Sequence, residues 1–162
     1  MTALPTSTRF YAPNVTKVWF VPTIASTALE VTRAELTAGT DLSDEVADLS
    51  GWNVTGEDIA TPGLSDFTGS VPGRTSVEAS SITFYADEDG VDARTVLTPG
   101  LSGYIVIADA GDIAGGVCDV FPVRVKAVGK PRTVTGSNAH HVTVGFSTPR
   151  KPAVDVDLPA AA

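Results

Sequence analysis

The sequence predicts a mainly β protein: a sandwich or barrel-like β fold with one or two short flanking α-helices and a long hairpin loop. Short runs of alternating apolar and polar residues, rich in β-branched and aromatic side chains, recur between turns formed by glycine and proline. Helix signals are confined to two short segments. With 162 residues, 43% of them hydrophobic, the chain is long and apolar enough to bury a core.

The first predicted elements are a strand and a short helix. Residues 16–22, TKVWFVP, form a strand that ends at Pro22. Thr32 and Glu35 then have the spacing of a capping box, and Gly39 is a typical helix stop. A helix of about two turns is not stable alone, so we expect it to pack against the rest of the fold.

The next strand, residues 45–57, changes phase at a glycine. Ala47 and Leu49 share one face, and the apolar face resumes one step late, after Gly51, at Trp52 and Val54. A slip of one residue at a glycine is typical of a β-bulge. With that bulge, the opposite face is polar and acidic, and consists of Asp48, Ser50, Asn53, Thr55 and Glu57.

Residues 61–77, TPGLSDFTGSVPGRTSV, contain two prolines and three glycines and show no periodicity. Compact domains rarely keep so long an unstructured connection unless it binds something or is disordered. In the strand that follows, Ile82 and Phe84 oppose Ser81 and Thr83. We expect this strand to pair with the preceding one as a long hairpin, with residues 58–76 as the loop at its tip.

The second half of the chain completes a prediction of about six strands. A short helix lies within residues 90–100, and residues 103–109 are predicted to be a buried strand because they are apolar on both faces. Strands at 118–130 and 139–147 are one-sided, and the first carries Arg124 and Lys126 on its polar face. We divide the chain into an N-terminal arm (1–13), a β domain (14–148) and a proline-containing C-terminal arm (149–162).

Charge is segregated along the sequence. The net charge is −8, yet residues 41–119 hold 15 acidic and 2 basic residues, whereas residues 120–151 hold 6 basic and no acidic residues. An acidic chain lacks the basic surface that tight binding of free nucleic acid requires. Segregated charge instead suits a protein whose copies dock acidic surface on basic surface.

No catalytic, metal or cofactor motif is evident. His140 and His141 are adjacent in a strand and point to opposite faces, so they do not easily chelate one ion. Residues 87–92, DEDGVD, lack the EF-hand spacing, and the lone Cys118 is predicted to be a buried thiol. We therefore expect no enzyme activity and no cofactor. We also expect no signal peptide and no membrane insertion.

Four segments, residues 14–25, 32–54, 71–112 and 120–133, resemble the major tail tube protein of long-tailed (siphovirus-type) bacteriophages, of the kind that infect actinobacteria. The resemblance runs from about Asn14 to Pro149 and includes the order of strands, helices and the long loop. It implies a self-assembling structural virion protein that forms stacked, hexameric rings. These rings build a tail tube in the host cytoplasm, and DNA passes down its bore without specific binding.

The resemblance also implies partners and contact residues. The partners are further copies of the chain and other tail proteins: the tape measure, the terminator and the baseplate or distal tail protein. The expected contacts between subunits or stacked rings are Phe67, Arg74, Arg124, Lys126, Arg150 and Lys151. The expected bore-facing residues are Asp48, Ser50, Asn53, Thr55, Glu57, Ser81 and Thr83. Because cations in the bore would grip phosphate, we expect the strand with Arg124 and Lys126 at a subunit interface or on the outside.

Two alternatives remain open. Phe67 either enters a pocket on the next ring or folds back on its own hairpin. The chain is either a tube subunit or a β-sandwich binding or adhesion module of a virion, or of a contractile-tail or type VI-like tube. The scattered tyrosines, Tyr11, Tyr85 and Tyr104, argue against a carbohydrate-binding platform.

Overall fold

The computed structural model describes residues 4, 7–9, 11–64, 66–135, 137 and 139–159. Part of the predicted N-terminal arm therefore lies outside the described residues. The chain forms two compact units. The first comprises residues 1–44, 103–121 and 152–162, and the second comprises residues 45–102 and 122–151. The mainly β fold with short helices is confirmed.

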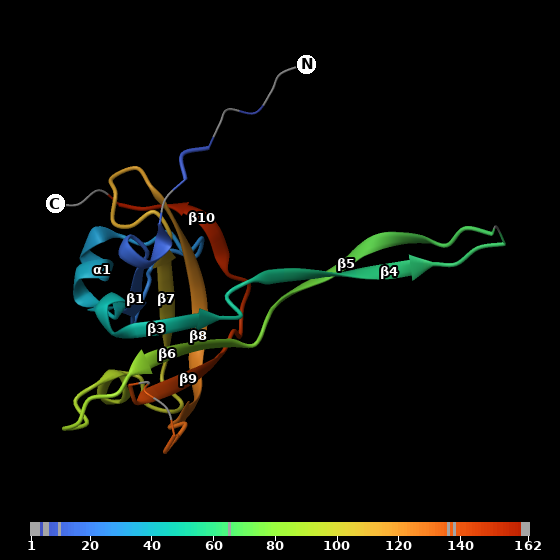
Figure 1. Ribbon diagram of the computed structural model, residues 1–162. Helices are drawn as coiled ribbons and strands as arrows, with labels where there is room; N and C mark the ends of the chain where they lie inside the picture. Colours follow the sequence, from blue (N-terminus) through green and yellow to red (C-terminus); the bar gives the residue numbers. More distant parts are fainter. Residues whose placement is uncertain are drawn as a thin grey trace. The chain divides into compact units, whose positions relative to one another are not determined.

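The first unit is built on β1 (Lys17–Val21), which pairs antiparallel with β2 (Thr40–Asp41) and β7 (Ser102–Ala108). The helix α1 (Arg33–Ala38) lies beside β1 (Figure 1). Its predicted capping box is confirmed: the backbone N–H of Glu35 donates to Thr32 Oγ1 at 3.3 Å, and the Glu35 carboxylate accepts from the Thr32 N–H at 2.8 Å. Short 3-10 turns at Ala12–Asn14 and Ser43–Glu45 complete the N-terminal part.

The C-terminal segment belongs to this first unit. Strand β10 (Ala153–Asp157) pairs with β8 (Val117–Gly129), and Leu158 is buried in the core beside Trp19 and Leu36. The prediction of an arm over residues 149–162 is therefore wrong for residues 153–158. Bidentate bonds from Arg33 to Asp112, at 2.6 and 2.9 Å, and a third bond from Arg33 to the Pro159 carbonyl hold this segment beside α1.

The second unit contains the later part of β8 and the strands β9 (His141–Ser147), β6 (Ser80–Tyr85) and β3 (Val46–Ser50), which are neighbours in that order. Alternate side chains of β6 and β9 are buried, as the sequence pattern predicts. The side chains of Ile82, Phe84, Val142 and Val144 are fully excluded from solvent. Together they give one face of this sheet a hydrophobic core.

Strands β4 (Val54–Thr61) and β5 (Gly69–Val77) form a separate two-stranded antiparallel ribbon, which Figure 1 shows as a long twisted hairpin. The prediction that residues 61–77 lack regular structure is therefore wrong, because β4 continues to Thr61 and β5 already begins at Gly69. The predicted hairpin itself is confirmed, since β3 pairs antiparallel with β6 and the two-stranded segment lies between them in sequence. We call β4, β5 and their turn the ribbon.

Gly51 separates the sheet from the ribbon. Its φ is +77°, and strand β3 ends at Ser50 while β4 begins at Val54. The predicted bulge is thus a complete break. A Cβ atom at Gly51 would lie 2.0 Å from the carbonyl oxygen of Ala79, so the backbone there approaches closely enough to require glycine.

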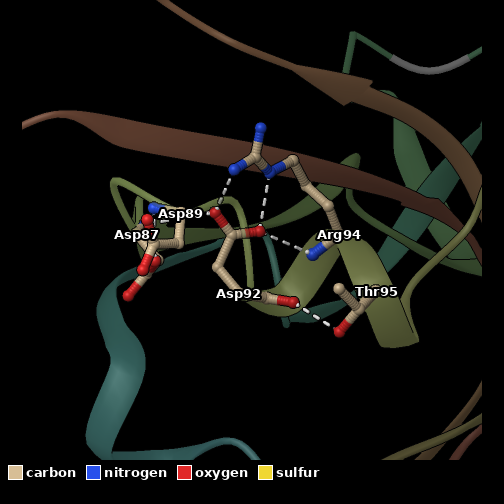
Figure 2. A network of polar contacts seen from close by, with 5 residues as sticks. All are labelled: Asp87, Asp89, Asp92, Arg94 and Thr95. Atoms are coloured by element: carbon tan, nitrogen blue, oxygen red, sulfur yellow. Dashed lines mark hydrogen bonds and ion pairs between the residues drawn. The ribbon is translucent and has the colours of Figure 1, made fainter.

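The short helix α2 (Ala93–Val96) is held by its N-cap, Asp92 (Figure 2). One Asp92 carboxylate oxygen accepts from the Arg94 backbone N–H and from Arg94 Nε, and the other accepts from Arg94 Nη2 at 2.6 Å. The Asp92 side chain is 2% exposed. The hydrogen bonds from Arg94 lower the pKa of Asp92 to about 2, against an ordinary value of 3.8.

The first prediction concerns Gly51→Ala. The left-handed backbone alone costs an alanine about 1–3 kcal/mol, and the Ala79 carbonyl adds a steric clash. Gly115→Ala is the matched control, since Gly115 has a φ of +75° and no atom within 4 Å of a Cβ. In urea titrations, Gly51→Ala should lower the free energy of unfolding clearly more than Gly115→Ala. Equal losses would show that Ala79 does not restrict this position.

The second prediction is that Asp92 makes the stability of the fold depend on pH. Because the pKa of Asp92 is depressed in the folded state, its ionised form stabilises the fold above pH 4, and this contribution is lost as the pH falls towards 2. Asp92→Asn keeps an oxygen for the helix cap but removes the charge. At pH 6 the variant should unfold with a free energy up to about 2 kcal/mol lower than wild type, and the difference should vanish near pH 2. A difference that is constant with pH would contradict the ion pair's role.

Candidate functional site

The β8–β9–β6–β3 sheet has an open face opposite its core. Pairing registers place Asp48 beside Thr83 and Thr83 beside Thr143, and place Ser50 beside Ser81 and Ser81 beside Gly145. We call this the polar face. Its described residues are Asp48, Ser50, Ser81, Thr83, Tyr85, Arg124, Ala127, Gly129, His141, Thr143, Gly145 and Ser147.

Most side chains on the polar face are small. The hydroxyls of Thr83 and Thr143 lie 3.3 Å apart across the β6–β9 pair, which neighbouring threonines commonly allow. At one end of the face, the rings of Tyr85 and His141 are tilted against each other, with centroids 5.2 Å apart. The result is a surface of mostly small side chains that is rich in hydroxyl groups.

The seven bore-facing candidates do not all lie on this face. Asp48, Ser50, Ser81 and Thr83 do, because they occur in paired β3 and β6. Asn53 lies in the break after Gly51, and Thr55 and Glu57 lie on β4 of the ribbon. The Thr55 hydroxyl is 3.3 Å from that of Ser76 on β5. The prediction that the five candidates between residues 48 and 57 share one continuous strand face is wrong, because the strand breaks at Gly51.

Arg124 shares the polar face. Its register partner is Ser147, two residues beyond Gly145 on β9. A register shift follows between Val125 and Ala127, and both Lys126 and Ala127 are exposed, as neighbouring residues of a bulge often are. Arg124 therefore lies on the same side of the sheet as Ser50 and Ser81, so the sheet itself does not separate it from these bore-facing candidates.

The ribbon carries exposed apolar side chains on one face and at its tip. Ile59 and Val71 are cross-strand neighbours, each about half exposed, and Ile59 lies close against Gly73. In the turn, Leu64 is fully exposed and Phe67 is 76% exposed. Sequence reasoning found Phe67 but missed Ile59 and Val71. Their alternation with Asp58 and Pro72 was the available signal, and the surrounding glycines and prolines obscured it.

The remaining contact candidates are exposed cations outside the polar face. Arg74 lies on β5, and Arg150 and Lys151 lie between β9 and β10. The structure thus distributes the six contact candidates over the ribbon, β8 and the segment after β9. It does not bring them together into one site.

An acidic concavity lies in the first unit. It has a volume of about 530 Å³ and is lined by Glu30, Asp155 and Asp157 together with Ala28 and Val156. Nearby, Asp119 accepts a hydrogen bond from the Asp155 N–H at 2.9 Å. Burial, and then the Asp155 carboxylate, raise the pKa of Asp119. Burial likewise raises the pKa of the Cys118 thiol to about 11.

Among the described residues, no group of three or more histidine, cysteine or acidic side chains is placed to hold a metal ion. In Figure 2, Asp92 is engaged by Arg94, and Asp87 accepts the Asp89 N–H at 2.7 Å. Within the described part of the chain, no helix has the length and apolar character needed to cross a membrane.

Comparisons with known proteins place the fold. A solved structure described as the baseplate of the anti-feeding prophage, six-fold symmetrised, is similar with a TM-score of 0.53 and 12% sequence identity. The match covers 93% of this chain and 95% of that one. No curated protein matches.

The family model described as phage tail tube protein matches residues 4–161, almost the full length. This match agrees with the mainly β fold and with the resemblance evident in the sequence. The chain belongs to the phage tail tube protein family, and is a structural protein of the virion tail that associates with other tail components.

Proposed function

We propose that this chain assembles with identical copies into stacked rings of six subunits, and that these rings form the tube through which DNA passes during ejection. Six-fold symmetry is supported by the resemblance and by the six-fold symmetrised baseplate of similar fold. Assembly takes place in the host cytoplasm, before the tail is complete. The role is structural rather than enzymatic.

The ribbon is the observation that carries this proposal. An isolated two-stranded hairpin is at best marginally stable in water, yet this one extends from Val54 to Val77 with most of its side chains exposed. Ile59, Val71 and Leu64 expose apolar surface to solvent, and such surface commonly marks a site of contact with another protein. We infer that the ribbon packs on a neighbouring ring, where Phe67 enters a pocket and Arg74 contacts an acidic surface.

The polar face fits the wall of a bore. One side of the β8–β9–β6–β3 sheet is core and the other is open, and β3 forms the end of the strand order. An edge strand without a partner is a template for pairing. We infer that β3 pairs with a neighbouring subunit, so that the polar faces close into one barrel.

Other tail proteins contact the ends of this tube. The tape measure, the terminator and the baseplate or distal tail protein are the partners that we propose. Arg150 and Lys151, which lie in the basic region of the sequence, are candidates for contacts with acidic surfaces of neighbouring subunits.

The alternative is a β-sandwich binding or adhesion module of a virion, or of a contractile-tail or type VI-like tube. The baseplate neighbour is compatible with it. The family match across residues 4–161 favours the tail tube.

Negative-stain electron microscopy of the purified chain tests the proposal. At high protein concentration we expect tubes with a regular axial repeat and rings of six in end views. Monodisperse monomers that bind glycans under the same conditions would support the adhesion module instead.

A further prediction concerns the ribbon. Replacing residues 56–75 with Asn-Gly leaves the Thr55–Ser76 pair joined by a tight turn. Because the core of the sheet is untouched, this variant should keep its circular dichroism spectrum and cooperative unfolding. It should fail to stack into tubes, since the contact between rings is removed.

A point variant refines the same test. Phe67→Ser should lower the extent of tube formation at least tenfold, as the loss of an aromatic anchor at an interface costs about 2 kcal/mol. Thr68→Ser, next to it in the turn, is the control and should assemble normally.

Long tubes formed by the variant with the shortened ribbon would show that the stacking of rings does not depend on the ribbon.

A further inference from the structure

Arg124 lies on the surface that we have proposed as the bore wall, and Lys126 is exposed at the bulge next to it. The β8–β9 register places Arg124 opposite Ser147, on the polar face, and the bulge after Val125 exposes Lys126 on the same stretch of β8. Their neighbours Ala127, Gly145 and Ser147 are small. Small neighbours leave the two long side chains accessible from solvent.

No carboxylate compensates these cations within the described residues. The ion pairs found there join Lys17 to Asp41, Arg33 to Asp112 and Arg94 to Asp92. The Arg124 Nε donates at 3.3 Å to the carbonyl of Gly100, a neutral acceptor, which orients the guanidinium without neutralising it. Both charges are therefore available to an anion.

Asp48 is the carboxylate among the described residues of the polar face, and it lies at the other edge of the sheet. It is on β3, whereas Arg124 is on β8, with β9 and β6 between them. Strands are spaced by about 4.8 Å, which separates the outer two by about 14 Å. That distance exceeds the Debye length of about 8 Å at physiological salt, so Asp48 does not cancel the positive potential near β8.

We propose that Arg124 and Lys126 form a contact site for the phosphodiester backbone of duplex DNA. The proposal rests on the proposed function for the place where DNA meets this face. Each subunit supplies one Arg124–Lys126 pair, so every ring carries a basic band on an otherwise hydroxyl-rich wall. The contacts are to phosphates and therefore independent of sequence. DNA that moves along the bore makes weak phosphate contacts at each ring, and the hydroxyl-rich wall between these bands does not bind it.

The test compares two variants that each remove two positive charges. Arg124→Ser/Lys126→Ser removes both cations of the proposed site and replaces them with serine, the residue that pairs with Arg124 at position 147. Arg9→Ser/Lys17→Ser is the control, because both residues lie in the first unit, outside the strands of this face, and neither is a proposed contact. Binding of a fluorescent 20-base-pair duplex to each full-length chain is measured by anisotropy between 10 and 150 mM salt, conditions in which phosphate contacts dominate.

The face variant should bind at least tenfold more weakly than wild type at 10 mM salt, and its plot of log K against log salt should be shallower by about 1.8 for two lost phosphate contacts. The control should change affinity less than threefold. Equal losses in both variants would overturn the proposal, since only net charge would then matter. Undiminished binding by the face variant would overturn it as well.

Negative-stain microscopy of the same samples separates this proposal from the tube itself. Tubes formed by both wild type and the face variant, with DNA binding lost only in the variant, support the site. Tubes lost in the face variant would assign Arg124 and Lys126 to contacts between subunits and overturn it. Absence of tubes from wild type would contradict the proposed function, whereas the anisotropy comparison still decides whether this face binds phosphate.

Discussion

The pairing of β6 on both of its edges is the constraint on which the second unit depends. Because β6 is bonded to β3 on one side and β9 on the other, its alternation fixes which side chains of three strands face the core. Ile82 and Phe84 point into that core, so Ser81 and Thr83 must point out of it. The polar face is thus a direct consequence of burying the opposite side, and a slip of one residue would exchange the two.

The sequence predicted those elements in which alternation is uninterrupted. The faces of β6 and β9 and the capping box of α1 followed from the order of apolar residues and from the Thr32–Glu35 spacing. Gly51 was recognised as a discontinuity, but a one-dimensional pattern does not distinguish a bulge from a break. The close approach of Ala79, which forces the break, comes from a residue far along the chain.

Strands β5 and β10 were missed because proline and glycine outweighed a weak alternating signal. In β5, Gly69, Pro72 and Gly73 suggest a loop, but cross-strand pairing with β4 supplies hydrogen bonds that the local sequence does not reveal. In β10, Val154 and Val156 alternate with aspartates over only five residues, and Asp155 adopts a φ of +56° within an irregular register. The shared face of Arg124 and Ser81 was likewise invisible, because it depends on registers across two strand pairs.

The reactivity of the buried Cys118 thiol can be used to measure local opening of the first unit. Alkylating reagents attack the thiolate, and a pKa of about 11 leaves almost none of it at neutral pH while the surrounding core is closed. Since β10 and Leu158 are part of that enclosure, the labelling rate of this single cysteine reports how readily the C-terminal strand detaches. Comparing the labelling rate of Cys118 in free subunits and in assembled particles shows whether assembly makes this local opening rarer.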